Sequence, residues 1–192
     1  MPSIEQHPLK PFLPTNAKVL MLGSFPPQQK RWSMNFFYPN FQNDMWRIMG
    51  IIFFADKNIF VDSQGRRFRQ EEIIRFAEET GIAMYDTAEA VQRLRDNASD
   101  NHLEIVRPTD IESLLLQLPL CRAIATTGEK ATEEIIRQYG VHKPKIGDAV
   151  LLQTGQRSLP LYRMPSSSRA YPLSIEKKAA YYHALFRDLG ML

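Results

Sequence analysis

The chain has 192 residues, 44% of them hydrophobic, and a formal net charge of +3 at pH 7. This length suits one core, so we expect a single domain over residues 1–192. The single cysteine, Cys121, excludes an internal disulfide and a four-cysteine cluster, and no segment has the ~18 apolar residues of a membrane helix. The first residues lack the apolar core of a signal peptide, so we expect a cytoplasmic protein with no membrane partner.

The first half of the chain alternates apolar runs of strand length with segments of helical periodicity. Its predicted elements are a strand over residues 18–22 (KVLML), a helix over 43–53, a small hairpin over 59–68, a helix over 70–79 and a strand (GIAMYD) that ends at Asp86. The two strands are apolar on both faces, which is typical of strands buried in a parallel sheet.

The second half continues the same alternation. Its predicted elements are a helix (IESLLLQL) capped by Thr109 or Asp110, a third strand (RAIATTG), a helix (EKATEEIIRQYG) ended by Gly140, a hairpin leading into a fourth core strand (AVLLQTGQRSLPLYRM) and an amphipathic helix over residues 174–189. This order favours a parallel sheet with helices on both faces.

Four polar or proline-rich segments follow the ends of these strands. They are GSFPP (23–27), Asp86, TTGEK (126–130) and MPSSS (164–168). Ligands of open parallel sheets bind beyond the carboxyl ends of the strands, so we expect the site there. Taken singly, each segment also fits a structural turn or cap. TTGEK lacks the spacing of a phosphate loop, G-x-x-x-x-G-K-[ST], which makes a nucleotide-binding hydrolase a minor alternative.

Together, these segments resemble the uracil-DNA glycosylase superfamily, and most of all its hypoxanthine-DNA glycosylase and mismatch-specific branch. The similar stretches are HPLKPFLPTNAKVLMLGSFPP, FFYPNFQNDMWRIMG, GIAMYDTAEAVQR with ASD at residues 98–100, and MPSSSRAYPLSIEKKAAYYHALF. The resemblance implies a three-layer α/β/α fold around a short four-stranded parallel sheet. It also implies a monofunctional DNA glycosylase of base-excision repair that needs no metal or cofactor.

A glycosylase must flip its target base out of the duplex into a pocket. By the resemblance, Tyr38 supplies the aromatic face for that base, although Phe36 and Phe37 are alternatives that also fit a core. The base carbonyl and the charge that develops on the departing base need hydrogen-bond donors. We expect these donors to be backbone amides of the first loop, at Gly23, Ser24 and Phe25.

The attacking water needs a residue that orients or deprotonates it. Several branches carry Asp or Asn where this chain has Phe25, and the fastest branch carries His where this chain has Met164. The hypoxanthine branch instead implicates an asparagine before the Trp-bearing helix, and Asn43 falls on that position. An amide can hold a water but is a poor base, so we expect a slow enzyme. Asp44 is the competing candidate because a carboxylate can accept the proton, and Asn43 can also be a helix cap.

The closing motif offers hydroxyl groups and amides that suit phosphates flanking a flipped nucleotide. The expected DNA-binding residues are Ser166, Ser167, Ser168 and Arg169. The chain departs from the branch where YPNFQN replaces a His-Pro-Arg-like run, where Pro27 replaces a serine, and in an insertion over residues 54–70. These departures leave the identity of the excised base open.

The sequence therefore predicts a monomeric DNA glycosylase that hydrolyses the N-glycosidic bond of uracil or hypoxanthine in DNA. The main alternative is a catalytically weak or inactive module of the same fold that binds damaged DNA. Phe25 and Met164 favour that alternative because they replace polar residues of related enzymes.

Overall fold

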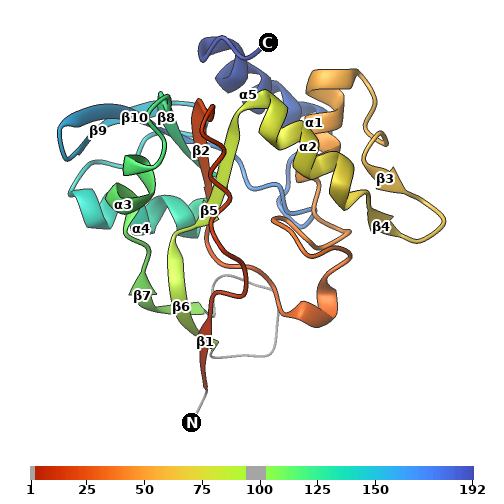
Figure 1. Ribbon diagram of the computed structural model, residues 1–192, viewed down its shortest axis with the longest axis horizontal. Helices are drawn as coiled ribbons and strands as arrows, with labels where there is room; N and C mark the ends of the chain where they lie inside the picture. Colours follow the sequence, from red (N-terminus) through yellow and green to blue (C-terminus); the bar gives the residue numbers. More distant parts are fainter. Residues whose placement is uncertain (1–2, 94–102) are drawn as a thin grey trace.

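A computed structural model describes residues 3–93 and 103–192, so the ASD stretch at 98–100 lies outside the described residues. Its centre is a five-stranded sheet of order β5-β2-β8-β10-β9, with helices on both faces (Figure 1). The sheet strands are β2 (Val19–Gly23), β5 (Ile82–Asp86), β8 (Ala123–Thr126), β9 (Ala149–Thr154) and β10 (Arg157–Arg163). This architecture confirms the predicted α/β fold.

The four core strands β5, β2, β8 and β10 run parallel, as predicted, and β9 pairs antiparallel with β10 as the outer arm of the predicted hairpin. Every residue of β2, β5 and β8 is buried, since helices cover both faces of the sheet. The carboxyl ends of the four parallel strands consequently lie at one edge of the sheet.

Five α-helices cover the sheet in the described residues. They are α1 (Met45–Phe54), α2 (Gln70–Thr80), α3 (Ile111–Leu116), α4 (Glu129–Tyr139) and α5 (Ile175–Asp188). Asp110 caps α3 by accepting a hydrogen bond from the Ser113 amide at 3.1 Å, and Gly140 ends α4 with a φ of 64°. Local sequence signals therefore set these boundaries to within a few residues.

A second, antiparallel sheet was not predicted. It has the order β1-β6-β7, from β1 (Ile4–Gln6), β6 (Ala88–Arg93) and β7 (Leu103–Pro108). Figure 1 shows it at the end of the molecule opposite to α5. Because β6 begins two residues after β5 ends, this sheet continues beyond the carboxyl edge of the main sheet. It supplies a wall beside the expected site.

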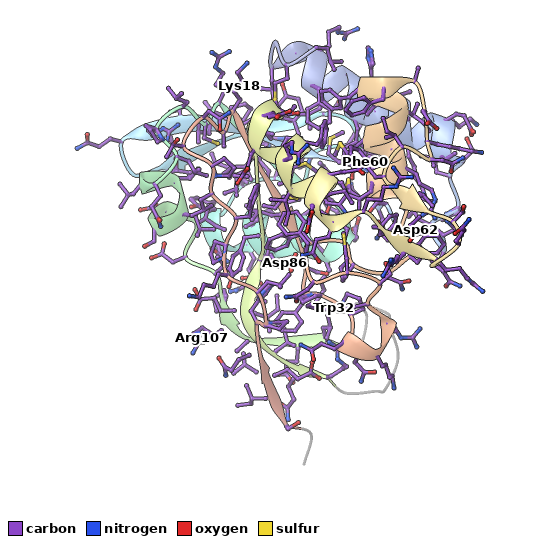
Figure 2. The ribbon with its side chains drawn as sticks, turned by 45° about the vertical axis from the view of Figure 1, so that its right-hand side comes forward. Lys18, Trp32, Phe60, Asp62, Asp86 and Arg107 are labelled. Atoms are coloured by element: carbon purple, nitrogen blue, oxygen red, sulfur yellow. The ribbon has the colours of Figure 1, made fainter. Side chains whose placement is uncertain are left out.

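The predicted hairpin in the insertion is present as β3 (Val61–Asp62) and β4 (Arg67–Phe68). Asp62 accepts hydrogen bonds from the Gly65 amide and the Arg67 side chain, which shapes the turn. Figure 2 shows Asp62 at the periphery and Asp86 in the interior of the molecule. The hairpin is thus a surface feature, whereas the strand end at Asp86 is internal.

Candidate active site

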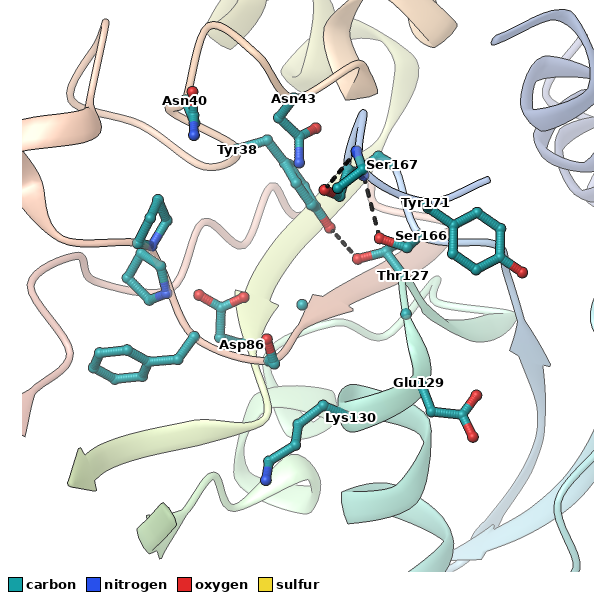
Figure 3. Close-up of a pocket in the computed structure, with 18 of the residues that line it drawn as sticks. Tyr38, Asn40, Asn43, Asp86, Thr127, Glu129, Lys130, Ser166, Ser167 and Tyr171 are labelled. Atoms are coloured by element: carbon teal, nitrogen blue, oxygen red, sulfur yellow. Dashed lines mark hydrogen bonds between the residues drawn. The ribbon is translucent and has the colours of Figure 1, made fainter. Parts of the chain in front are cut away.

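A cavity of about 670 Å³ opens at the carboxyl edge of the parallel strands. This volume is within the range of ligand sites. Its lining includes all four segments expected from the sequence, together with the aromatic stretch before α1 (Figure 3). The lining segments are residues 23–27, 37–40, 42–43, 127–130 and 163–172, with Asp86 between them.

Gly23 and Asp86 meet at the end of the paired strands β2 and β5. A Cβ atom on residue 23 would lie 2.4 Å from Oδ1 of Asp86, so only glycine leaves room for this carboxylate. The Thr109 hydroxyl donates to the Asp86 carbonyl at 2.7 Å, which fixes the backbone behind it. The first loop therefore begins with a backbone that closely approaches an acidic side chain.

Asp86 also contacts a residue to which the sequence assigned no role. Nε2 of His7 lies 2.8 Å from Oδ2 of Asp86, and the His7 and Asp86 side chains are 2% and 10% exposed. The histidine lies in the HPLKPFLP segment, 79 positions from its partner. A histidine followed by a proline between β1 and β2 could be seen in the sequence, but no local pattern connected it to Asp86.

Tyr38 crosses the cavity from the segment before α1 to the loop after β8. Its hydroxyl lies 2.9 Å from Oγ1 of Thr127, and its ring meets that of Trp46 edge to face. Burial raises the pKa of Tyr38 well above its usual value, so the phenol is neutral at physiological pH. Its φ of 53° is rare for a bulky residue, and such backbone strain often occurs at functional sites.

The other aromatic candidates differ in where their rings lie. Phe36 packs against Phe12 and Trp46 in the main core, while Phe37 lies at the cavity. Phe25 borders the cavity, but its ring packs with the apolar side chains of the antiparallel sheet. The stacking role of Tyr38 and the amide roles of Gly23, Ser24 and Phe25 stay predictions.

Asn43 lines the cavity just before α1. Its Oδ1 accepts a hydrogen bond from the Met45 amide at 2.9 Å, so it ties the loop to the first turn of the helix. This contact leaves the two N–H groups of its side-chain amide as donors for a ligand. Figure 3 shows Asn43 beside Tyr38 at the upper side of the cavity.

Asp44, the competing candidate, is buried in a cluster of cations. Its carboxylate lies 3.0 Å from Arg169, 3.8 Å from Lys178 and 3.9 Å from Arg47. Its backbone amide donates to the Ser167 carbonyl at 2.9 Å. Asp44 is not among the described residues that line the cavity. The carboxylate thus links the Asn43 loop to the serine loop.

The serine loop is shaped by its own hydroxyl groups. The Ser166 hydroxyl accepts from the Ser168 amide at 3.2 Å, and the Ser168 hydroxyl accepts from the Ala170 amide at 3.3 Å. Ser167 is buried, whereas the Arg169 side chain is 53% exposed. All four expected DNA-binding residues line the cavity, and a backbone bridge between Asn43 and Ser168 brings both loops together.

Basic side chains surround the cavity mouth. Arg31, Arg93, Lys130, Arg163 and Arg169 all contribute to its lining. Glu5 pairs with Arg93 and Glu129 pairs with Arg163. The described lining also holds three acidic side chains, Asp86, Glu129 and Glu133, against these five basic ones. The net charge of the lining is thus positive, which suits a polyanion such as a nucleic acid backbone.

In residues 3–93 and 103–192, no three His, Cys, Asp or Glu side chains are grouped so that they could hold a metal ion. Within the same ranges, no helix is long and apolar enough to span a bilayer.

Comparison with known proteins gives a structural match. A solution NMR structure from Methanosarcina acetivorans, provisionally described as a uracil DNA glycosylase, superposes with a TM-score of 0.63. The match covers 98% of this chain and 99% of that chain at 22% sequence identity. The two chains share one fold. No protein-family model and no curated protein sequence match the chain.

Proposed function

We propose that this protein is a DNA glycosylase that hydrolyses the N-glycosidic bond of uracil or hypoxanthine flipped out of DNA. The observation that carries the proposal is one cavity, on a uracil-DNA-glycosylase-like fold, bordered by Tyr38, Asn43 and the serine loop. The protein acts as a cytoplasmic monomer, and its partner is DNA with a deaminated or mismatched base.

In the proposed reaction, a water oxygen forms a bond to C1′ of the deoxyribose as the N-glycosidic bond breaks. The bonding electrons leave with the base, and the water loses a proton to solvent. The departing base becomes anionic, so amides of the first loop at Ser24 and Phe25 stabilise it by hydrogen bonds. The neutral ring of Tyr38 stacks on the base.

Asn43 holds the water, because its amide borders the cavity and has N–H groups to donate. Asp44 acts as a positioning residue rather than as the base, since three cations surround its carboxylate. An amide accepts protons poorly, so the expected reaction is slow.

The serine loop and Arg169 hold the phosphates that flank the flipped nucleotide. Hydroxyl groups, amides and one half-exposed guanidinium are the groups that commonly contact a DNA backbone. The basic mouth of the cavity adds a contribution that does not depend on sequence and weakens as salt increases.

A second candidate is a module that binds damaged DNA without cleaving it. The observation that favours it is the lack of a free acid beside Asn43 in the described residues, where Asp44 is ion-paired and Met164 is buried. Such a module would use the same cavity and the same DNA contacts.

The deciding experiment uses labelled duplexes that carry one uracil or one hypoxanthine opposite each normal base. Wild type, Asn43→Ala and Asp44→Asn are incubated in excess over DNA, and abasic sites are cleaved with alkali. Abasic product from wild type that falls sharply with Asn43→Ala supports both the glycosylase and its water-holding residue.

Loss with Asp44→Asn alone, in a variant that melts near the wild-type temperature, would keep the glycosylase and overturn the role of Asn43. Wild type that retains the damaged duplex on a gel yet releases no base would favour the binding module.

A further inference from the structure

His7 is a buried polar side chain that the proposed reaction does not use. Its backbone amide donates to the Glu89 carbonyl at 2.8 Å, just after β1 pairs with β6. Its ring lies among three aromatic rings, with centroids 4.5 Å from Tyr85, 5.2 Å from Phe25 and 6.3 Å from Phe37. The fold thus fixes both the position and the plane of this imidazole.

The contacts of both ring nitrogens define the hydrogen bond that reaches Asp86. Nδ1 of His7 lies 3.1 Å from the Leu9 amide nitrogen, which donates to it, and Nε2 lies 2.8 Å from Oδ2 of Asp86. A ring that accepts at Nδ1 carries its hydrogen on Nε2, so it donates to the carboxylate. A doubly protonated ring would also donate from Nε2 to the carboxylate. Its second hydrogen, on Nδ1, would be donated to the Leu9 carbonyl oxygen, which lies 2.8 Å away.

This hydrogen bond commits one carboxylate oxygen and sets the orientation of the other. Oδ1 of Asp86 lies over the Cα of Gly23, at the start of the loop expected to hold the base. Figure 3 shows Asp86 within the cavity, below Tyr38. An ionised carboxylate only accepts hydrogen bonds, so a ligand that meets it must present an N–H or O–H group.

We propose that His7 is a positioning residue that holds Asp86 as a fixed hydrogen-bond acceptor for the ring N–H of the flipped base. The inference rests on the proposed function and adds a chemical criterion for its substrate. Uracil has this N–H at N3 and hypoxanthine has it at N1. The equivalent ring nitrogens of cytosine and adenine are acceptors, which a carboxylate repels. The pair therefore favours keto-bearing bases, which include the deaminated ones, over cytosine and adenine.

The test measures binding, because binding does not require catalysis. Two duplexes carry uracil or 3-methyluracil opposite guanine, each on a sugar fluorinated at C2′ so that the glycosidic bond resists hydrolysis. Dissociation constants come from fluorescence anisotropy. Wild type is expected to prefer uracil by roughly ten- to hundredfold, the effect of leaving a buried acceptor unpaired.

Substitutions at His7 separate the hydrogen bond from the packing. His7→Phe fills the aromatic surroundings without a donor and should reduce the uracil preference by roughly fivefold or more. His7→Gln carries an N–H donor and should restore part of it. In an Asp86→Asn background, His7→Phe should have little further effect, since contacting residues are not additive. His142→Phe, at an exposed histidine, is the control.

Equal weakening of both duplexes by His7→Phe would overturn the inference, because it would show a structural role only. A wild type that binds uracil and 3-methyluracil equally would also overturn it. The same preparations are tested on an ordinary uracil duplex for abasic product. Absence of product would count against the glycosylase, while the binding ratio would still decide the role of His7.

Discussion

Asp44 and Asp86 are both buried aspartates near the same cavity, but they have different partners. Asp44 lies within ion-pair distance of Arg169, Lys178 and Arg47. Within residues 3–93 and 103–192, Asp86 has a single basic partner, His7, and one of its oxygens lies at the edge of the candidate base site.

The comparison shows that the role of a buried carboxylate depends on the charged groups that contact it. Three cations around Asp44 hold together two loops that are 125 positions apart, which leaves the carboxylate poorly placed to accept a proton from water. One histidine beside Asp86 fixes the carboxylate and leaves it an oxygen for a ligand. We therefore expect removal of Asp44 to affect stability first, and changes at Asp86 to affect recognition first.

The largest expected effect is on the free energy of unfolding. Asp44→Ala leaves Lys178, whose side chain is 1% exposed, without its counter-charge, and should lower stability by about 3–5 kcal/mol. Asp86→Ala should cost about 1–2 kcal/mol, because the imidazole that it leaves can be neutral. Urea denaturation measures both, with Asp62→Ala on the exposed hairpin as the control. Equal losses at Asp44 and Asp86 would contradict the comparison.

The second effect is on the rate of base release. Asn43→Ala should reduce the single-turnover rate by roughly a hundredfold, because the attacking water loses the amide that orients it. The loss of its bond to the Met45 amide should cost about 1 kcal/mol of stability. Asn40→Ala is the matched control, because Asn40 also lines the cavity and bonds a nearby amide, that of Gln42. A larger loss of rate with Asn40→Ala than with Asn43→Ala would show that Asn40, and not Asn43, holds the attacking water.

The third effect is the response to alkaline pH around Asp86. Burial raises the pKa of Tyr85 to about 12, and the nearby carboxylates of Glu89 and Asp86 add to the rise. An unfolded tyrosine loses its proton near pH 10, so the unfolded state binds fewer protons between pH 10 and 12. Stability should therefore fall as pH rises through this window.

With Tyr85→Phe, the fall in the free energy of unfolding between pH 10 and 12 should be smaller by about 1 kcal/mol. Asp86→Asn should make the fall smaller by a lesser amount. Urea denaturation midpoints from pH 9 to 12 measure both effects. If the midpoints of Tyr85→Phe depend on pH as those of wild type do, the prediction fails. That result would show that the Tyr85 hydroxyl group is more hydrated than its position beside His7 indicates.

The smallest expected effect is at Arg169, the exposed cation of the Asp44 cluster. Arg169→Ala should lower stability by less than about 1 kcal/mol, since the pair is open to water on the arginine side. It should reduce the slope of log binding constant against log salt for DNA by about 1 if Arg169 contacts a phosphate. Arg137→Ala is the control, because Arg137 is also an exposed arginine in an ion pair, with Glu134. Equal slopes for both variants would exclude a phosphate contact at Arg169.

Local patterns accounted for most of the secondary structure. Apolar runs of strand length predicted β2, β5 and β8, because strands covered on both faces need apolar residues throughout. A short acidic side chain and a glycine marked the ends of α3 and α4, since each satisfies or permits a specific backbone geometry. The same alternation placed four loops at one edge of the sheet.

The antiparallel sheet was not predictable in this way, because β1 pairs with a strand more than 80 positions away. The roles of the two aspartates depended on contacts of the same kind. His7 reaches Asp86 across 79 positions, and Arg169 reaches Asp44 across 125.

The sequence by itself determined the parallel α/β fold and the sheet edge at which the cavity opens, because periodicity and strand-end chemistry are local properties. Only the tertiary structure decided which acid is surrounded by cations and which faces the cavity. The difference depends on residues that are far apart in the sequence and come into contact only on folding, so no spacing along the chain predicts it.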